Sequence, residues 1–253
     1  MTDGESVRAM TDVAAAAEPR HERRLQRMRA AHSYWAVLGA IFIAFFLSAL
    51  LPDAAWATSL IVLVQSATLL IVIWTAGWAM TERAVPFALA SAAVVAAAID
   101  FFWQGKALTA ALAITAGVLS VTIAVAIAAG AVAQHEVNSR SVAGAICVYI
   151  LFGMLFLWLY SLLTVLDSSP FFAQGIDGTR ALRLYFSFTT LATLGYGDYT
   201  AASNLGHALA VLEALIGQLY LVTVVAVVVT RLGRPGRAML KQAKESEIDG
   251  PQA

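Results

Sequence analysis

The sequence predicts an all-α integral membrane protein with six transmembrane helices. Hydrophobic residues make up 60% of the 253 residues and charged residues only 13%, whereas an average soluble domain is about half apolar and about a quarter charged. The apolar residues fall in long uncharged runs, and roughly 20 apolar residues cross the hydrocarbon core of a bilayer as a helix. Between the last two runs lies a stretch too short to cross. We therefore expect a re-entrant short helix and loop between helices five and six.

Six runs are predicted to span the membrane. Asp53 lies in a turn so short that it joins the first two as an antiparallel pair, Asp100 interrupts the third, and Glu213 lies within the sixth. The predicted spans are 33–52, 54–81, 84–104, 107–134, 141–166 and 205–230. An even number of spans puts both ends of the chain on one side of the bilayer.

Basic residues decide the orientation, because Lys and Arg concentrate in cytoplasmic segments. One side would hold only Lys106, Arg180 and Arg183, and the other side holds the rest of the juxtamembrane cations. These are Arg20, Arg23, Arg24, Arg27, Arg29, Arg83, Arg140, Arg231, Arg234, Arg237, Lys241 and Lys244. The sequence thus predicts two cytoplasmic termini, and the Ala-rich, compact chain favours a multi-pass protein of the bacterial inner membrane.

Four segments follow from these patterns. Residues 1–31 form a basic cytoplasmic segment, read mainly as a topogenic charge cluster and alternatively as a contact for anionic lipid. Residues 32–138 form a four-helix membrane domain, 139–233 a pore-type domain, and 234–253 a short cytoplasmic tail. We expect no ligand-binding domain in that tail, since a folded domain needs about 50 residues.

The segment between the fifth and sixth spans contains the candidate functional residues. A helix over 180–191 would be about 18 Å long, half of a bilayer. The chain must then return through non-helical backbone, which membranes tolerate only where it lines protein or water. The sequence thus predicts a loop that lines a cavity.

The returning strand runs from Thr193 to Asp198 and has two alternating glycines, Gly195 and Gly197. Rings of backbone carbonyls can replace the water shell of a potassium ion. Successive carbonyls point to one axis when alternate residues adopt left-handed angles, which glycine does without steric cost. The Thr193 hydroxyl can add an oxygen, and Tyr196 is expected to brace the strand through its phenol.

The string Thr193-Leu194-Gly195-Tyr196-Gly197-Asp198 resembles the signature T-x-G-Y-G-D of the potassium channel superfamily, here of a prokaryotic six-span type with a two-helix pore module. The resemblance covers about 141–237. It implies a homotetramer, K⁺ bound by the carbonyls of Thr193, Leu194, Gly195 and Tyr196 and by the Thr193 hydroxyl, no cofactor besides the transported ion, no enzymatic activity and no nucleic-acid partner.

The pore helix departs from the family pattern at two places. Thr189 stands where many members have a glutamate behind the filter, and Tyr185-Phe186 replaces a pair of tryptophans. We expect Asp198, Thr189 and Thr190 to support the filter instead. Leu194 replaces the more usual valine, with little consequence because only its carbonyl is used.

Two residues of the last span have open roles. Glu213 could hydrogen-bond the back of the pore helix at Ser187, Thr189 or Thr190, or it could be a protonated carboxyl packed between subunits without a role in conduction. Gly217 could be a gating hinge, as the resemblance implies, or a site of close helix packing.

The fourth span carries neither Lys nor Arg. A membrane field acts on such charges, at about 2.3 kcal/mol per charge per 100 mV. The sequence therefore predicts potassium conduction without steep voltage gating. The alternatives are a less selective cation channel and a non-conducting membrane scaffold protein.

Overall fold

The computed structural model describes residues 20–76, 80–102, 105–132 and 139–232. Their regular structure is helical, apart from two isolated bridges that join Phe172 to Ile176 and to Ala201. The helices are α2 (Arg20–Leu50), α3 (Ala55–Ala76), α4 (Met80–Phe102), α5 (Lys106–Val132), α6 (Ser139–Leu166), α7 (Arg180–Leu191) and α8 (Asn204–Leu232). Each predicted span corresponds to one long helix, and α7 has the predicted bounds.

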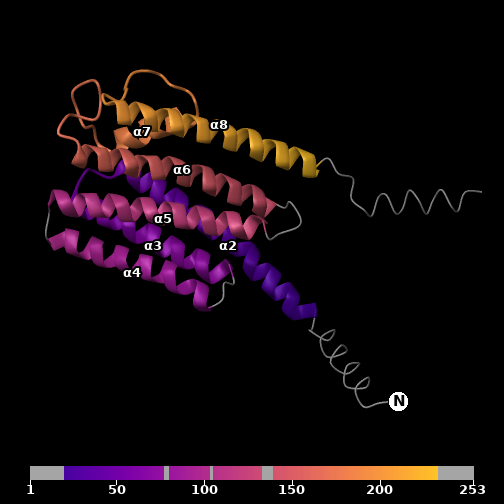
Figure 1. Ribbon diagram of the computed structural model, residues 1–253. Coiled ribbons are helices and arrows are strands. Elements are labelled where there is room, and N and C mark those ends of the chain that lie inside the picture. The colour runs from indigo at the N-terminus through magenta and orange to yellow at the C-terminus, as the bar shows by residue number, and fades with distance from the viewer. Residues whose placement is uncertain (1–19, 77–79, 103–104, 133–138, 233–253) are drawn as a thin grey trace, which may run out of the picture.

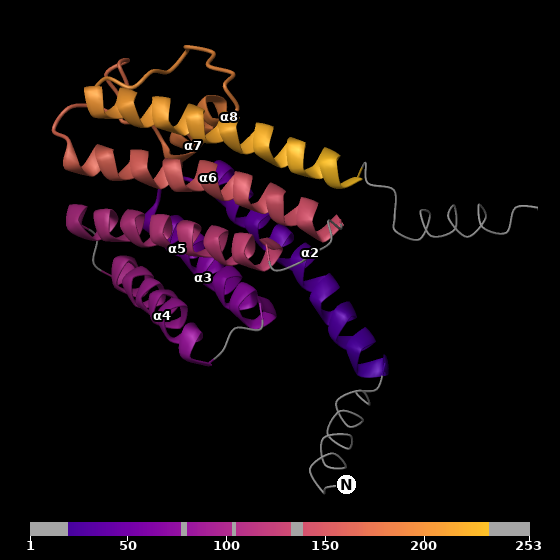
Figure 2. The ribbon, with the colours of Figure 1, turned by 45° about the vertical axis from the view of Figure 1, so that its right-hand side comes forward.

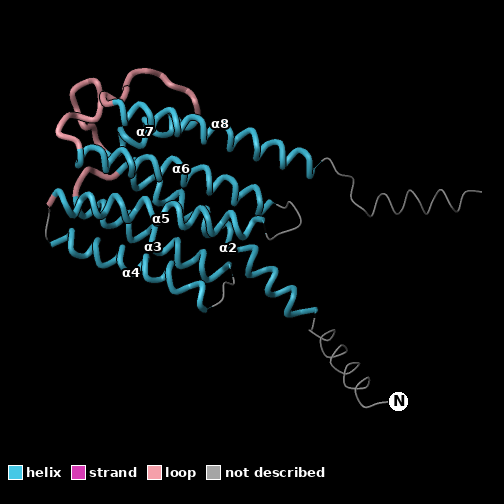
Figure 3. Tube along the Cα trace, in the orientation of Figure 1, coloured by secondary structure: helices cyan, strands magenta, loops and turns pink. Residues whose placement is uncertain are grey.

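The six long helices lie side by side, with successive helices antiparallel (Figures 1 and 2). The start of α2 and the end of α8 lie at one end of the bundle. The short helix α7 lies at the other end, beneath α8, among the loops that join α6 to α8 (Figure 3). Contacts join α7 to α6, α8 and α2. Helices from both predicted membrane domains therefore contact α7.

Four of the described helices contain an apolar stretch long enough to cross a membrane. The stretches are Ala55–Trp74, Lys106–Ala129, Val142–Leu166 and Asn204–Val224. In α2 and α4 the apolar stretches, Trp35–Leu50 and Ala84–Asp100, are shorter. The protein is thus a helical membrane protein, and the count of six spans stays a prediction.

An aromatic cluster fixes the loop between α6 and α7. Phe171 and Phe172 are buried against Tyr160 of α6 and Phe186 of α7. The rings of Phe171 and Phe172 meet edge to face at 4.8 Å, and Phe172 meets Phe186 at 5.5 Å. Such pairs add to the free energy of burial. The loop is therefore packed onto both helices, and it delivers the chain to α7 at a defined place.

The helix α7 begins with a side-chain cap. The hydroxyl of Thr179, whose backbone is extended, accepts a hydrogen bond from the N–H of Leu182. Threonine is favoured at this position because it satisfies one of the N–H groups that a helix start leaves free. At its other end α7 stops at Leu191, just before the motif that the sequence singled out.

Candidate functional site

The candidate filter, residues 193–198, is bound to the last turn of α7 through the backbone. The N–H of Thr193 donates to the carbonyl oxygen of Thr190 at 2.9 Å. The carbonyl of Thr189 accepts from the N–H groups of Leu194 and Gly195, at 2.8 and 3.2 Å. The side chain of Thr189 instead donates to the Phe186 carbonyl. Thr189 and Thr190 thus contact the filter through their carbonyl groups, as part of the helix end.

Alternate residues of the filter adopt left-handed backbone angles. The φ angles are 56° at Thr193, 51° at Gly195 and 76° at Gly197. The sequence predicted this for the two glycines. Thr193 was not foreseen, and it has the one positive φ found at a non-glycine residue in the described ranges. A β-branched residue in this region is an outlier, and such outliers gather at functional sites.

The filter is open to its surroundings in the single chain. Leu194 is 57% exposed and Tyr196 is 67% exposed. The neighbouring helix α8 is also open, since only 11% of its apolar stretch is buried, against 61% for α6. The filter segment and α8 are therefore open in a chain whose helices α3, α5 and α6 are each more than half buried over their apolar stretches.

Asp198 joins the filter to two other segments. Its carboxylate accepts from the Tyr185 hydroxyl of α7 at 2.9 Å, and its carbonyl accepts from Gln174 at 2.8 Å. The rings of Tyr185 and Tyr196 stack, with centroids 6.4 Å apart. The brace thus differs from the one expected, because the hydroxyl bond to Asp198 comes from Tyr185, while Tyr196 contributes its ring.

Glu213 lies between three helices and is fully buried, with 0% exposure. The Tyr160 hydroxyl of α6 donates to its Oε2 at 2.6 Å, and its Oε1 lies 2.5 Å from Ser187 Oγ of α7. Of the three partners proposed from the sequence, the contact found is with Ser187. The carboxyl is buried within one chain, so the packing between subunits considered as its alternative is not its position here.

The number of protons available determines which hydrogen bonds Glu213 and Ser187 can form. Ser187 Oγ also lies 2.8 Å from the carbonyl oxygen of Gly153. A hydroxyl has one proton to donate, and Gly153 and Glu213 are both acceptors when the carboxyl is ionised. A protonated Glu213 satisfies every contact, since it donates to Ser187 and Ser187 donates to Gly153. The cluster therefore links α6, α7 and α8 most completely with a neutral carboxyl.

Gly217 is a point of close packing between α8 and the end of α7. A Cβ added to Gly217 would overlap the carbonyl oxygen of Leu191 and would lie 3.0 Å from its side chain. The absence of a side chain lets the two backbones approach. The structure thus supports the packing role for Gly217, and the hinge role stays a prediction.

Replacing Gly217 with alanine should destabilise the protein, because the added methyl group meets backbone that cannot rotate away. Overpacking of this kind costs about 1–3 kcal/mol. The thermal unfolding midpoint of the detergent-solubilised protein should fall. Gly39→Ala is the matched control, since nothing lies within 4 Å of its added Cβ. An unchanged midpoint for Gly217→Ala would contradict the close contact.

Sequence reasoning missed the roles of three residues of this region. Tyr160 gave no signal, because any of many tyrosines can face a neighbouring helix, and Tyr185 was noted only as part of the pair that replaces two tryptophans. Arg180 was used only for topology. Its place at the start of a half-span helix, on the same predicted side of the membrane as Asp53, could have indicated a pair of opposite charges.

The class of protein follows from these features together. The short helix α7 is followed by a segment with alternating positive φ angles, on the open side of a bundle of apolar helices. A family model described as "Ion channel" matches residues 144–234, from α6 through α8. The match supports an ion channel, a membrane transport protein rather than an enzyme. Comparison with curated proteins and with solved structures gives no match.

Proposed function

We propose that the chain is one subunit of a potassium-selective channel that conducts K⁺ passively through a tetrameric pore. The observation that carries this proposal is the alternation of left-handed angles at Thr193, Gly195 and Gly197. Alternation turns successive carbonyls toward one side of the strand. A row of such oxygens can replace the hydration shell of K⁺.

The ion ligands in this proposal are the carbonyls of Thr193, Leu194, Gly195 and Tyr196, with the Thr193 hydroxyl at the inner end. Gly197 permits the turn toward Asp198, whose bond from Tyr185 holds the outer end of the strand. The C-terminal end of α7 points its negative dipole end toward the inner side, where it favours a cation.

Fourfold assembly follows from the need to close a ring around the ion. One strand supplies one side of an ion site, and identical subunits close such a ring by cyclic symmetry. The open apolar face of α8 supports this proposal, because other copies would cover it. In the membrane we place both termini in the cytoplasm, and the basic segment 1–31, whose side chains lie outside the described residues, beside the inner leaflet.

Ion flux with the purified protein in liposomes tests the function. Vesicles loaded with potassium should take up rubidium down the electrical gradient, and barium should block the uptake. A reversal potential measured between potassium and sodium solutions separates a selective channel from a general cation channel. Equal permeation of the two ions would reject potassium selectivity, and absence of any flux would favour a scaffold protein.

Voltage should change the open probability only gently. The helix α5 occupies the place of a voltage sensor, and its one basic residue is Lys106 at its first position. Recordings between about −100 and +100 mV should therefore lack a steep sigmoid, since each charge moved through the field contributes about 2.3 kcal/mol per 100 mV. A voltage dependence equivalent to several charges per channel would show that α2–α5 sense voltage by another route.

A further inference from the structure

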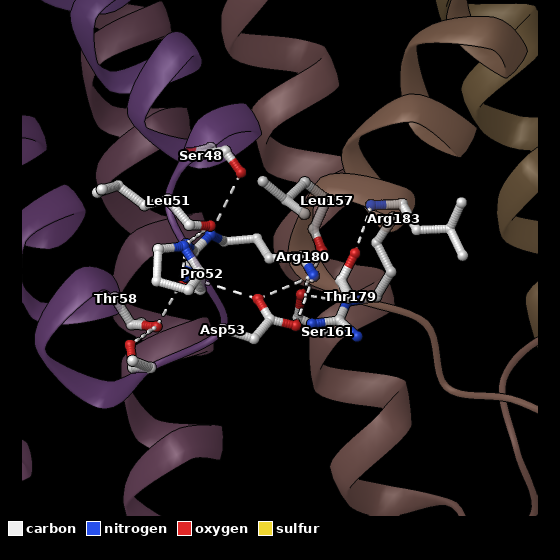
Figure 4. Close-up of polar contacts among 12 residues, drawn as sticks. Ser48, Leu51, Pro52, Asp53, Thr58, Leu157, Ser161, Thr179, Arg180 and Arg183 are labelled. Atoms are coloured by element: carbon white, nitrogen blue, oxygen red, sulfur yellow. Dashed lines mark hydrogen bonds and ion pairs between the residues drawn. The ribbon is translucent and has the colours of Figure 1, made fainter.

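The first residue of α7 is held by the corner between α2 and α3. Arg180 is 2% exposed. Its guanidinium donates to Thr58 Oγ1 at 3.0 Å and to the carbonyl oxygens of Leu51 and Pro52, both at 3.1 Å. A longer bond of 3.4 Å joins its Nε to the Ser48 carbonyl. Figure 4 shows the side chain reaching from α7 into this corner. These bonds tie the candidate pore helix to the four-helix part of the same chain.

Asp53 binds the same residue from the other direction. Its two carboxylate oxygens accept the backbone N–H of Arg180, at 3.0 and 2.8 Å. Its Oδ1 also lies 3.9 Å from the guanidinium. The first N–H groups of a helix lack partners within the helix and carry its positive dipole end, so a carboxylate there is favourable. Asp53, which lies between α2 and α3, therefore caps the N-terminal end of α7.

The pairing compensates a buried charge. Burial lowers the pKa of Arg180, and the Asp53 carboxylate opposes that shift. Arginine still stays charged in proteins. A buried charge that loses its partner destabilises its surroundings more than a surface charge would. In the two residues, called here the corner anchor, the partly exposed Asp53 thus offsets the burial of the Arg180 charge.

The helix α7 connects the corner anchor to the filter. It has 12 residues, and its far end accepts the filter N–H groups at Thr189 and Thr190. Near that end Phe188 packs edge to face against Phe45 of α2, with ring centroids 5.0 Å apart. A shift of α2 or of the corner between α2 and α3 would therefore move α7 as a rigid helix. Its C-terminal end, which hydrogen-bonds the filter, would move with it.

We propose that the corner anchor, Asp53 with Arg180, positions α7 and thereby sets the ion selectivity of the filter and the lifetime of its conducting form. This inference rests on the proposed channel function. It gives the helices α2 and α3 a role other than voltage sensing. They supply the outer support of the filter, through a contact within one subunit.

Substitutions at the anchor test the proposal in liposomes. Arg180→Gln removes the charge and most of the donors. Asp53→Asn keeps the shape of the side chain, removes its charge and replaces one of its two acceptor oxygens by an amide group that donates. Both variants should lower the K⁺ over Na⁺ permeability ratio or shorten the conducting time. We expect a change of about tenfold, which is typical of the energetic coupling between two distant sites of a protein. Ser48→Ala is the matched control, because its side chain bonds Ala44 and only its backbone carbonyl accepts from Arg180.

A second measurement avoids variants that fail to fold. A cavity of about 290 Å³ opens beside the anchor and is lined by Asp53, Thr58, Thr109 and Arg180 among others. Thr58→Cys channels can be assembled first and then treated with a water-soluble methanethiosulfonate from outside. Modification should change selectivity or conducting time, whereas Thr109→Cys, in the same cavity but without a bond to Arg180, should change neither. The native Cys147 is fully buried and stays unmodified.

The outcomes separate the two proposals. Assembled tetramers of Arg180→Gln and Asp53→Asn with wild-type selectivity and conducting time would overturn the anchor. If those variants fail to assemble, an unaltered flux after modification of Thr58→Cys overturns it. A wild-type protein that does not distinguish K⁺ from Na⁺ would instead reject the proposed function, and the anchor would then be judged by conducting time alone.

Discussion

Replacing Gly195 with alanine should abolish potassium flux through the reconstituted protein. Gly195 has a φ of 51°, and an L-residue in the left-handed region costs roughly 1–2 kcal/mol. Four copies would enter one ring in the proposed tetramer, so the cost to the conducting form is about 4–8 kcal/mol. Relief of this strain rotates the peptide and turns a carbonyl away from the ion path. Rubidium uptake by liposomes measures the loss.

Gly175→Ala is the matched control for that experiment. Gly175 also has a positive φ, 78°, and nothing lies within 4 Å of a Cβ added at either glycine. The two substitutions therefore introduce backbone strain of the same kind, one in the filter and one in the loop before α7. Gly175→Ala should conduct like wild type. Wild-type flux through tetramers of Gly195→Ala would show that these carbonyls do not line the ion path.

Replacing Glu213 with alanine should impair the flux or make it decay sooner. The substitution leaves the buried hydroxyl of Tyr160 without its acceptor, whereas Ser187 loses its contact with the carboxyl and keeps its bond to the Gly153 carbonyl. Each buried polar group left unsatisfied costs about 1–3 kcal/mol, and the vacated space weakens the packing of α6, α7 and α8 further. The time course of rubidium uptake, together with the oligomeric state by size-exclusion chromatography, measures the effect.

Glu213→Gln is the informative comparison. The amide nitrogen can donate to Ser187 as a protonated carboxyl does, and the amide oxygen can accept from Tyr160. We therefore expect flux and its duration close to wild type for this variant. If Glu213→Ala tetramers conduct as well and for as long as wild type, the cluster stabilises nothing that the filter needs. If Glu213→Gln fails like Glu213→Ala, the carboxyl must be ionised, and the proton count given above is wrong.

The helices and their order could be predicted from the sequence because they depend on local properties. Long uncharged runs specify helices in a membrane, where the backbone must bond to itself. The bounds of α7 were predicted as well, since the span of apolar residues after Gly178 is too short to cross and ends before a glycine-rich strand. The positive φ at Gly195 and Gly197 followed from their alternation. Thr193 escaped prediction, because nothing local requires a threonine to adopt that conformation.

The sequence reduced the candidate partners of Glu213 to three residues but could not identify which of them it contacts. Counting residues along α8 put Glu213 at the depth of the pore helix and gave three candidate partners. The choice of Ser187 depends on the rotation of α7 about its axis, which the aromatic packing of Phe171, Phe172 and Phe186 sets. Tyr160 lies 53 residues earlier in the chain, and no pattern in the sequence pairs it with Glu213.

The sequence by itself determined a helical membrane protein with a filter-like strand after a half-length helix, because composition and glycine spacing act over a few residues. Only the tertiary structure decided what holds that helix. In sequence, Arg180 and Asp53 are two charges 127 positions apart, and Arg180 was used only as a marker of topology. Folding brings α7 against the corner of α2 and α3, where the buried guanidinium of Arg180 bonds the corner carbonyls and Thr58, and where Asp53 accepts the backbone N–H of Arg180. Such long-range contacts arise from the packing of whole helices, and packing is decided by all of their side chains at once.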